Sequence, residues 1–238
     1  MEKGAYASRW FKVIVVLVLL AAPAAGELGS DKQHAATYQQ LDSIAAADTT
    51  LQRLMEGNQR FSSGRLVQKE DVVGRRIELI KGQSPSAVVL SCSDSRVPPE
   101  LVFDQGLGDI FVIRVAGNVA APVELGSIEY AVEHLNVPLI IVLGHDRCGA
   151  VTATIKGGKQ EGNIRSIVRK IAPSVRKAKA TGKKGEELLD AAIEENAKNV
   201  AAVLMKESKV IKHLVEQKRL KIVAAKYVFE SGKVELLK

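Results

Sequence analysis

"DIFVIRVAGNVAAPVELGSIEYAVEHLNVPLIIVLGH", residues 109–145, decides the fold of this 238-residue chain. Both ends of the stretch are short runs rich in Val and Ile without clear polar alternation, which is typical of strands covered on both faces. Residues 123–137, between these runs, have the pattern of a helix. A strand, a helix and a strand at this spacing predict a right-handed crossover and a parallel α/β sheet.

The sequence on either side extends the same sheet. "SAVVLSC" (residues 86–92) is a further buried strand, and "RLKIVAAKYVFESGKVELL" (residues 219–237) predicts a strand, a turn and a strand. Residues 163–217 are predicted to be helical, with breaks near Pro173 and at residues 181–185. We therefore predict an α/β fold with a mainly parallel central sheet flanked by helices, and a C-terminal strand hairpin.

Helices are also predicted ahead of the sheet, as an N-terminal extension. Residues 48–64 predict a helix with its N-cap at Thr49 or Thr50 and its end near Gly57. A second helix fits residues 68–83. Residues 27–45 are polar and rich in alanine, and we interpret them as a flexible or loosely helical lead-in to a main domain at residues 46–238.

The first 26 residues have the layout of a secretory signal. Three basic residues precede an unbroken run of apolar or small residues from Val13 to Ala25, and small residues suited to signal peptidase end it. The run is shorter than the roughly 20 residues that cross a bilayer. We expect cleavage at about residues 24–26, export to the periplasm and no stable membrane anchor afterwards; an uncleaved N-terminal anchor is the alternative.

The charge pattern argues against a nucleic-acid partner. The formal charge is +7, and loss of residues 1–26, with three basic residues and one acidic residue, lowers it to +5. The remaining Lys and Arg lie mostly between Lys156 and Lys221, interleaved with acids as on a solvated helical face. Few aromatic residues are available for stacking on bases.

Reactive side chains stand at the ends of two of the predicted strands. Cys92 ends the strand at residues 86–92 and Asp94 follows it, and His145 ends the later strand and Cys148 follows it. Because ligands gather at the carboxyl ends of parallel strands, we expect these side chains to meet. Two thiolates and an imidazole are strong zinc ligands and leave a fourth position open. The alternative for two cysteines in an exported chain is a structural disulfide.

Arg96 is the informative neighbour of Asp94. A guanidinium beside a carboxylate keeps that carboxylate charged, and a bidentate pair fixes its direction. Held in this way, Asp94 can accept a hydrogen bond from a metal-bound hydroxide instead of binding the metal. The alternative is a loop salt bridge of little energetic consequence.

"CSDSR" (residues 92–96) and "GHDRC" (residues 144–148) resemble the motifs of the β-class carbonic anhydrases, and the likeness runs from about residue 46 to residue 238. The resemblance implies one Zn²⁺ per subunit, held by Cys92, His145 and Cys148. It also implies a dyad of Asp94 and Arg96 beside the metal.

Asp94 has two possible positions in that family. The aspartate of this motif is the fourth zinc ligand of a closed, inactive form. A subset of the family also holds bicarbonate at an inhibitory site with a tryptophan, where this chain has Val89. We therefore expect the open form, with water rather than Asp94 on zinc.

The resemblance also implies a substrate pocket. Gln83, nine residues before Cys92, matches a glutamine that hydrogen-bonds substrate in plant-type members. Phe111, Tyr130 and Gly149 are assigned to the pocket lining. The alternatives are a turn residue for Gln83 and ordinary core packing for the two aromatic residues. Family members assemble as dimers or larger sets, often with the pocket at the dimer interface, so we expect at least a homodimer.

The function implied by the resemblance is reversible hydration of CO2 to bicarbonate and a proton by zinc-bound hydroxide. Two alternatives remain at this point. A hydrolase of COS or CS2 on the same scaffold would need the same metal ligands. A non-enzymatic, disulfide-linked exported binding module would need the two cysteines to be oxidised.

Overall fold

The computed structural model describes residues 27–67, 71–158 and 160–238. The signal predicted at residues 1–26 lies outside them. No helix within the described ranges combines the length and the apolar character that a membrane span requires. Residues 38–238 form one compact unit, and this unit holds the whole sheet.

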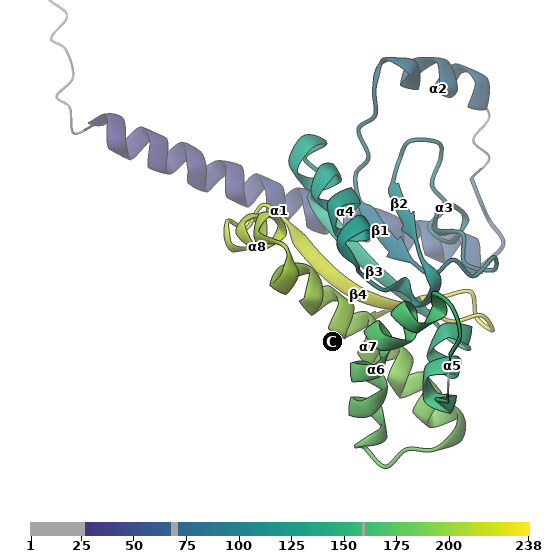
Figure 1. Cartoon of the computed structure of the whole chain (residues 1–238). Coiled ribbons are helices and arrows are strands. Elements are labelled where there is room, and N and C mark those ends of the chain that lie inside the picture. Colours follow the sequence, from purple (N-terminus) through teal and green to yellow (C-terminus); the bar gives the residue numbers. More distant parts are fainter. Residues whose placement is uncertain (1–26, 68–70, 159) are drawn as a thin grey trace, which may run out of the picture. The chain divides into compact units, whose positions relative to one another are not determined.

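Helices cover a central sheet in the unit formed by residues 38–238, to which the first helix contributes only from Tyr38 onward (Figure 1). The helices are α1 (Glu27–Ser62), α2 (Val72–Glu78), α3 (Pro99–Val102), α4 (Pro122–His134), α5 (Gly149–Lys156), α6 (Ile164–Lys179), α7 (Gly185–Glu207) and α8 (Lys209–Glu216), with short 3-10 helices η1 (Leu79–Lys81) and η2 (Ala116–Asn118). The strands are β1 (Val88–Ser91), β2 (Phe111–Arg114), β3 (Leu139–His145), β4 (Lys221–Tyr227) and β5 (Val234–Leu237).

The sheet has the order β2-β1-β3-β4-β5. The first four strands in this order are parallel, and β5 pairs antiparallel with β4. The mainly parallel sheet and the C-terminal strand pair predicted from the sequence are therefore confirmed. Ser91 at the end of β1 lies opposite Arg114 at the end of β2 and opposite Leu143 of β3, so the carboxyl ends of these strands lie at one edge.

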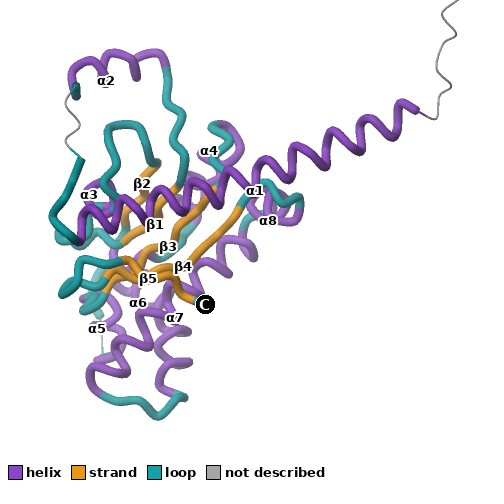
Figure 2. Tube along the Cα trace, turned by 180° about the vertical axis from the view of Figure 1, so that it is seen from behind, coloured by secondary structure: helices purple, strands orange, loops and turns teal. Residues whose placement is uncertain are grey.

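Both faces of the sheet are covered by helices. Successive strand residues point to opposite sides, so neighbouring residues of one strand pack on different faces. Val88 and Leu90 pack with α4, α7 and α8 on one face. Val89 and Ile141 pack on the other face with Leu54 of α1 and Val102 of α3. Figures 1 and 2 show these helices on the two sides of the strands. This double coverage is the reason that the strands carry continuous apolar runs.

A third apolar cluster lies beyond the carboxyl ends of β1 and β3. It contains Cys92 and Cys148 together with Val151 of α5, Ile171 of α6 and Ile193 of α7. The two thiols are thus enclosed by three helices that follow β3 in the sequence.

The first helix differs from its prediction. The N-cap predicted at Thr49 or Thr50 is wrong, because α1 runs without interruption from Glu27 to Ser62. Alanine has the highest helix propensity, and the alanines at residues 45–47 continue the helix through this point.

Gly57 does not end α1 either. A Cβ atom at this position would lie 1.9 Å from the carbonyl oxygen of Phe103. The glycine therefore lets the helix approach the chain that follows α3, and its role is close packing rather than termination.

The helical region after β3 has different breaks from those predicted. Pro173 is exposed within α6 and does not interrupt it, so the predicted break there is wrong. The break at residues 181–185 is confirmed, since it separates α6 from α7. A break at Ser208 was not predicted. The Ser208 hydroxyl accepts a hydrogen bond from the Ile211 N–H at 3.2 Å and caps α8.

Candidate metal centre

Two strand ends deliver the three predicted ligands to one place. Cys92 directly follows β1, and His145 is the last residue of β3. Arg147 adopts a positive φ of 53°, which turns the chain after His145 so that Cys148 becomes the N-cap of α5. The two cysteine sulfurs and a ring nitrogen of His145 all lie within 4.8 Å of one another.

The buried histidine has the chemistry of a metal ligand. His145 is 0% exposed, and its Nδ1 lies 2.8 Å from the carbonyl oxygen of Asp146. A carbonyl only accepts, so Nδ1 carries the proton and Nε2 presents a lone pair. Nε2 is buried and has no hydrogen-bond partner within the described residues. An orphaned imidazole nitrogen beside two thiols fits a zinc ion, whose preferred ligands are nitrogen and sulfur.

The two thiols have opposite pKa shifts, and only Cys92 is shifted toward the thiolate. The Cys148 thiol, as a hydrogen-bond partner, lowers the pKa of Cys92; burial opposes this, and the His145 ring and the Gly117 N–H lower it further. The same pairing raises the pKa of Cys148, as does its burial. A divalent cation that binds both sulfurs would favour the thiolate of each, because thiolates are the form of cysteine that binds metals.

Asp94 and Arg96 form the pair predicted from the sequence. Arg96 donates from Nε to Asp94 Oδ1 at 2.9 Å and from a terminal nitrogen to Oδ2 at 2.7 Å. The Arg96 side chain holds the pKa of Asp94 well below its usual range, and burial opposes this shift. Asp94 Oδ2 also lies 3.9 Å from His145 Nε2. The dyad therefore stands beside the ligand cluster with both carboxylate oxygens engaged.

Two residues that support the first motif by three hydrogen bonds were missed by the sequence analysis. Arg114 at the end of β2 donates to the carbonyl of Cys92 at 3.1 Å and to that of Asp94 at 2.5 Å. The N–H of Gly117 donates to the sulfur of Cys92 at 3.3 Å. Gly117 has φ +70°, and a Cβ there would lie 2.6 Å from Ile171 Cδ1, so glycine is required.

The aromatic residue Phe229, in the turn between β4 and β5, was also missed. Its ring lies under the Arg96 guanidinium, with Arg96 Cζ 4.1 Å from the ring centroid. It also lies 5.4 Å from the His145 ring, centroid to centroid. No local pattern marks Phe229, because its partners lie far away in the sequence.

Of the residues assigned to the substrate pocket, only Gly149 adjoins the ligand cluster. Phe111 and Tyr130 contact each other, with ring centroids 6.3 Å apart. Phe111 is the first residue of β2 and pairs with Val88, the first residue of β1, so both are at the amino end of the sheet. Gln83 is exposed on the segment before β1 and makes no hydrogen bond to any described residue. Gly149 is exposed next to Cys148, at the start of α5.

Cys92 and Cys148 are both free. The alternative of a structural disulfide between them is therefore wrong. Their sulfurs instead face His145 as separate groups that can each bind a metal.

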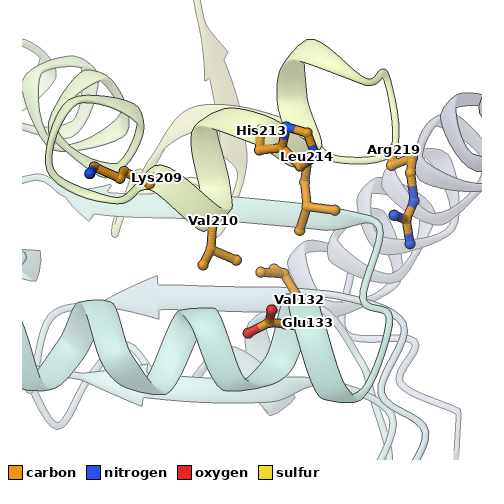
Figure 3. A pocket seen from close by; sticks show the side chains of 7 residues that line it. All are labelled: Val132, Glu133, Lys209, Val210, His213, Leu214 and Arg219. Carbon is orange, nitrogen blue, oxygen red and sulfur yellow. The ribbon is translucent and has the colours of Figure 1, made fainter.

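A cavity of about 550 Å³ between α4 and α8 does not belong to this site (Figure 3). Apolar Val132, Val210 and Leu214 form part of its wall. Its charged or titratable lining residues are Glu133, Lys209, His213 and Arg219. None of the predicted ligand or pocket residues lines it, so the chemistry of the site does not involve this cavity.

Comparison with known proteins gives a consistent set of relatives. The family model described as carbonic anhydrase matches residues 87–234. Carbonic anhydrase 2 of Mycobacterium tuberculosis is 43% identical over 187 residues, which cover 77% of this chain and 89% of that protein. Carbonic anhydrase of Mycolicibacterium smegmatis is 42% identical with the same coverage. The solved structure of the β-carbonic anhydrase CcaA has a TM-score of 0.64 at 27% identity and covers 79% of this chain and 98% of that one.

Proposed function

Because this chain belongs to the β-carbonic anhydrase family and is a carbonic anhydrase, we propose that Cys92, His145 and Cys148 hold one zinc ion per subunit, and that this site hydrates CO2 reversibly. The observation that carries the proposal is the buried three-ligand cluster with the unpartnered Nε2 of His145. Three protein ligands leave one tetrahedral position for chemistry.

The residues around the cluster have separate roles in the proposed reaction. When bound, zinc supplies Lewis acidity that makes water a nucleophile near neutral pH. Asp94 is ionised at that pH and acts as a hydrogen-bond acceptor, so it fixes the direction of the attacking group toward CO2. Arg96 holds Asp94 in that direction, and Arg114 holds the backbone on which Asp94 sits.

The open form is proposed for neutral pH. Both oxygens of Asp94 are engaged by Arg96, which competes with direct binding of the carboxylate to a metal. Val89 is fully buried in the apolar core of β1, where a charged bicarbonate ion would be costly to place. These two observations support an active site that has no inhibitory state of the kind associated with a tryptophan at this position.

We also propose that the pocket is completed by a second copy of the chain. Phe111 and Arg114 are three residues apart in β2, which places the start of the strand about 10 Å from the metal edge. Tyr130 is 48% exposed beside Phe111, and Gln83 is exposed on the segment leading into β1. Residues exposed at the amino end of one subunit can line the metal edge of a partner in a symmetric homodimer.

Zinc content and CO2 hydration test the function directly. The chain from residue 27 would be purified, its zinc measured, and hydration followed by stopped flow from acidic to alkaline pH. Fast hydration already near neutral pH is expected, because in the proposed open form Asp94 is not on the metal at that pH. Activity confined to alkaline pH would place Asp94 on the metal. A zinc-loaded protein without CO2 activity would refute the proposal, and a panel with COS and CS2 would then identify a related hydrolase.

Export is a separate proposal. It rests on the basic start, the apolar run and the small residues within residues 1–26. The intact mass of protein recovered from the periplasm of the producing cell is expected to correspond to a chain that starts between residues 25 and 27. A full-length chain in the membrane fraction would instead indicate an uncleaved anchor.

A further inference from the structure

Phe229 contacts two functional groups that come from different loops. One is the guanidinium of Arg96, which follows β1, with Cζ 4.1 Å from the ring centroid. The other is the ring of His145 at the end of β3, with centroids 5.4 Å apart and planes inclined by 54°. One ring thus connects the arginine of the dyad with a ligand of the metal centre.

The position of this ring is fixed from several sides. The N–H of Phe229 donates to Asp146 Oδ1 at 3.1 Å, and the N–H of Asp146 donates to the carbonyl of Tyr227 at 3.1 Å. Asp146 therefore ties the metal-ligand loop to the turn between β4 and β5. The ring of Tyr227 also meets the Phe229 ring edge-on at 5.5 Å. Tyr227 is only 5% exposed, so the Phe229 ring packs on a buried side chain.

Arg96 needs such a support more than the other groups of the site. Its side chain is 55% exposed, and a long exposed arginine has many rotamers. The bidentate pair fixes Asp94 relative to Arg96, but it does not fix the pair relative to the metal ligands. The negative face of an aromatic ring attracts a guanidinium placed over it. Arg114 holds the backbone of the first motif, and the face of Phe229 adds a fixed reference for the Arg96 side chain.

We propose that Phe229 is a positioning residue that holds Arg96, and through it Asp94, in a fixed direction relative to His145. The inference rests on the proposed function, because only that function gives the direction of Asp94 a catalytic meaning. Phe229 has no side-chain atom that could bind a metal ion. Its side chain acts through the stacked guanidinium and the histidine ring.

The test compares variants that keep or remove the aromatic face. Phe229→Leu and Phe229→Met retain most of the volume on Tyr227 but lose the ring, whereas Phe229→Tyr keeps it. Phe61→Leu is the matched control, because Phe61 also packs on Tyr227, at 6.2 Å between centroids, and makes no aromatic or cation–π contact with Arg96 or His145 among the described residues. Two variants without the ring guard against one that does not fold.

The primary measurement is the Arg96 Nε–H signal in a proton–nitrogen NMR spectrum, which the Phe229 ring current shifts upfield. Phe229→Leu is expected to abolish this shift and to lower kcat/KM about three- to fivefold, as for a lost exposed cation–π contact. Zinc retention against a chelator is expected to stay unchanged. Phe229→Tyr is expected to restore both the shift and the rate, and Phe61→Leu to leave both at the wild-type level.

Three results would overturn the proposal. The Arg96 signal could keep its position in Phe229→Leu and Phe229→Met, Phe61→Leu could lower the rate by the same factor, or zinc could be lost together with the ring. Wild-type protein that holds zinc but does not hydrate CO2 would refute the proposed function alone. The Arg96 signal would still decide whether Phe229 orients the dyad, because that measurement needs no turnover.

Discussion

Cys148 shows how much of the metal centre depends on one atom. Its sulfur is one of three ligand atoms within 4.8 Å of one another, and the side chain is 2% exposed. Cys148→Ala leaves two ligands, and zinc affinity is expected to fall by more than about 100-fold, since loss of an indirect contact alone costs about 10- to 100-fold. Metal content after dialysis against a chelator measures this.

Val151→Ala is the control for Cys148→Ala. It removes atoms from the same apolar cluster without touching a ligand, and it is expected to keep zinc. Full metal content and rate in Cys148→Ala would show that Cys148 is not a ligand.

Arg96 determines the protonation of Asp94. Its side chain lowers the pKa of Asp94, whose unfolded value is about 3.9. A carboxylate with a lowered folded pKa stabilises the fold above the unfolded pKa, and this stabilisation is lost as the pH falls through the folded value. Arg96→Met is expected to raise the Asp94 pKa toward the ordinary range. Carbon NMR of the Asp94 carboxyl measures the titration.

Arg76→Met serves as the comparison for Arg96→Met. It removes an exposed arginine of α2 and the same formal charge. An Asp94 titration that is the same in both variants would mean that general charge, rather than the bidentate pair, sets the pKa.

The sequence predicts residues of the site when their spacing carries the chemistry. Cys92, His145 and Cys148 were found because each stands at or just after a strand end, where a parallel sheet collects polar groups. Arg114 and Phe229 were not found. Their contacts with the first motif cross the sheet or join distant turns, and nothing in their local sequence differs from that of an ordinary strand or turn.

Substitutions of Gly57 test how closely α1 packs against the chain that follows α3. Gly57→Ala would place a Cβ 1.9 Å from the Phe103 carbonyl oxygen, and we expect a loss of about 1–3 kcal/mol in the free energy of unfolding. Gly126→Ala, in α4, meets no atom within 4 Å and is expected to stabilise by about 0.5–1 kcal/mol through helix propensity. Urea unfolding of both variants measures the contrast. Equal effects would mean that α1 does not approach the chain after α3 so closely.

Helix boundaries were predicted less well than strands, for a physical reason. A strand covered on both faces shows a continuous apolar run, as in β1 and β3. A helix boundary depends on caps and packing. Pro173 is tolerated inside α6 because it is exposed, where water can satisfy the carbonyl freed by its missing N–H. Gly57 is retained inside α1 because of what it packs against.

Two sets of residues assigned to one reaction lie at opposite ends of the sheet. The proposed metal ligands lie at its carboxyl edge, while Phe111 and Tyr130 lie together at its amino end. In a symmetric dimer that brings the amino end of each sheet to the metal edge of its partner, every active site would contain side chains from both subunits. The assembly, rather than the single chain, would then be the catalytic unit.

Mixed dimers test this arrangement. Cys148→Ala subunits lack a ligand, and Gln83→Ala subunits lack the proposed substrate contact. If each site combines Cys148 of one subunit with Gln83 of the other, a mixed dimer contains one intact site and one doubly defective site. Random mixing by co-expression is therefore expected to recover about a quarter of the wild-type sites. If Gln83 served its own subunit, mixing would give only the average of the two parent variants. Stopped-flow CO2 hydration of co-expressed subunits, compared with separately purified variants combined after assembly, distinguishes these outcomes.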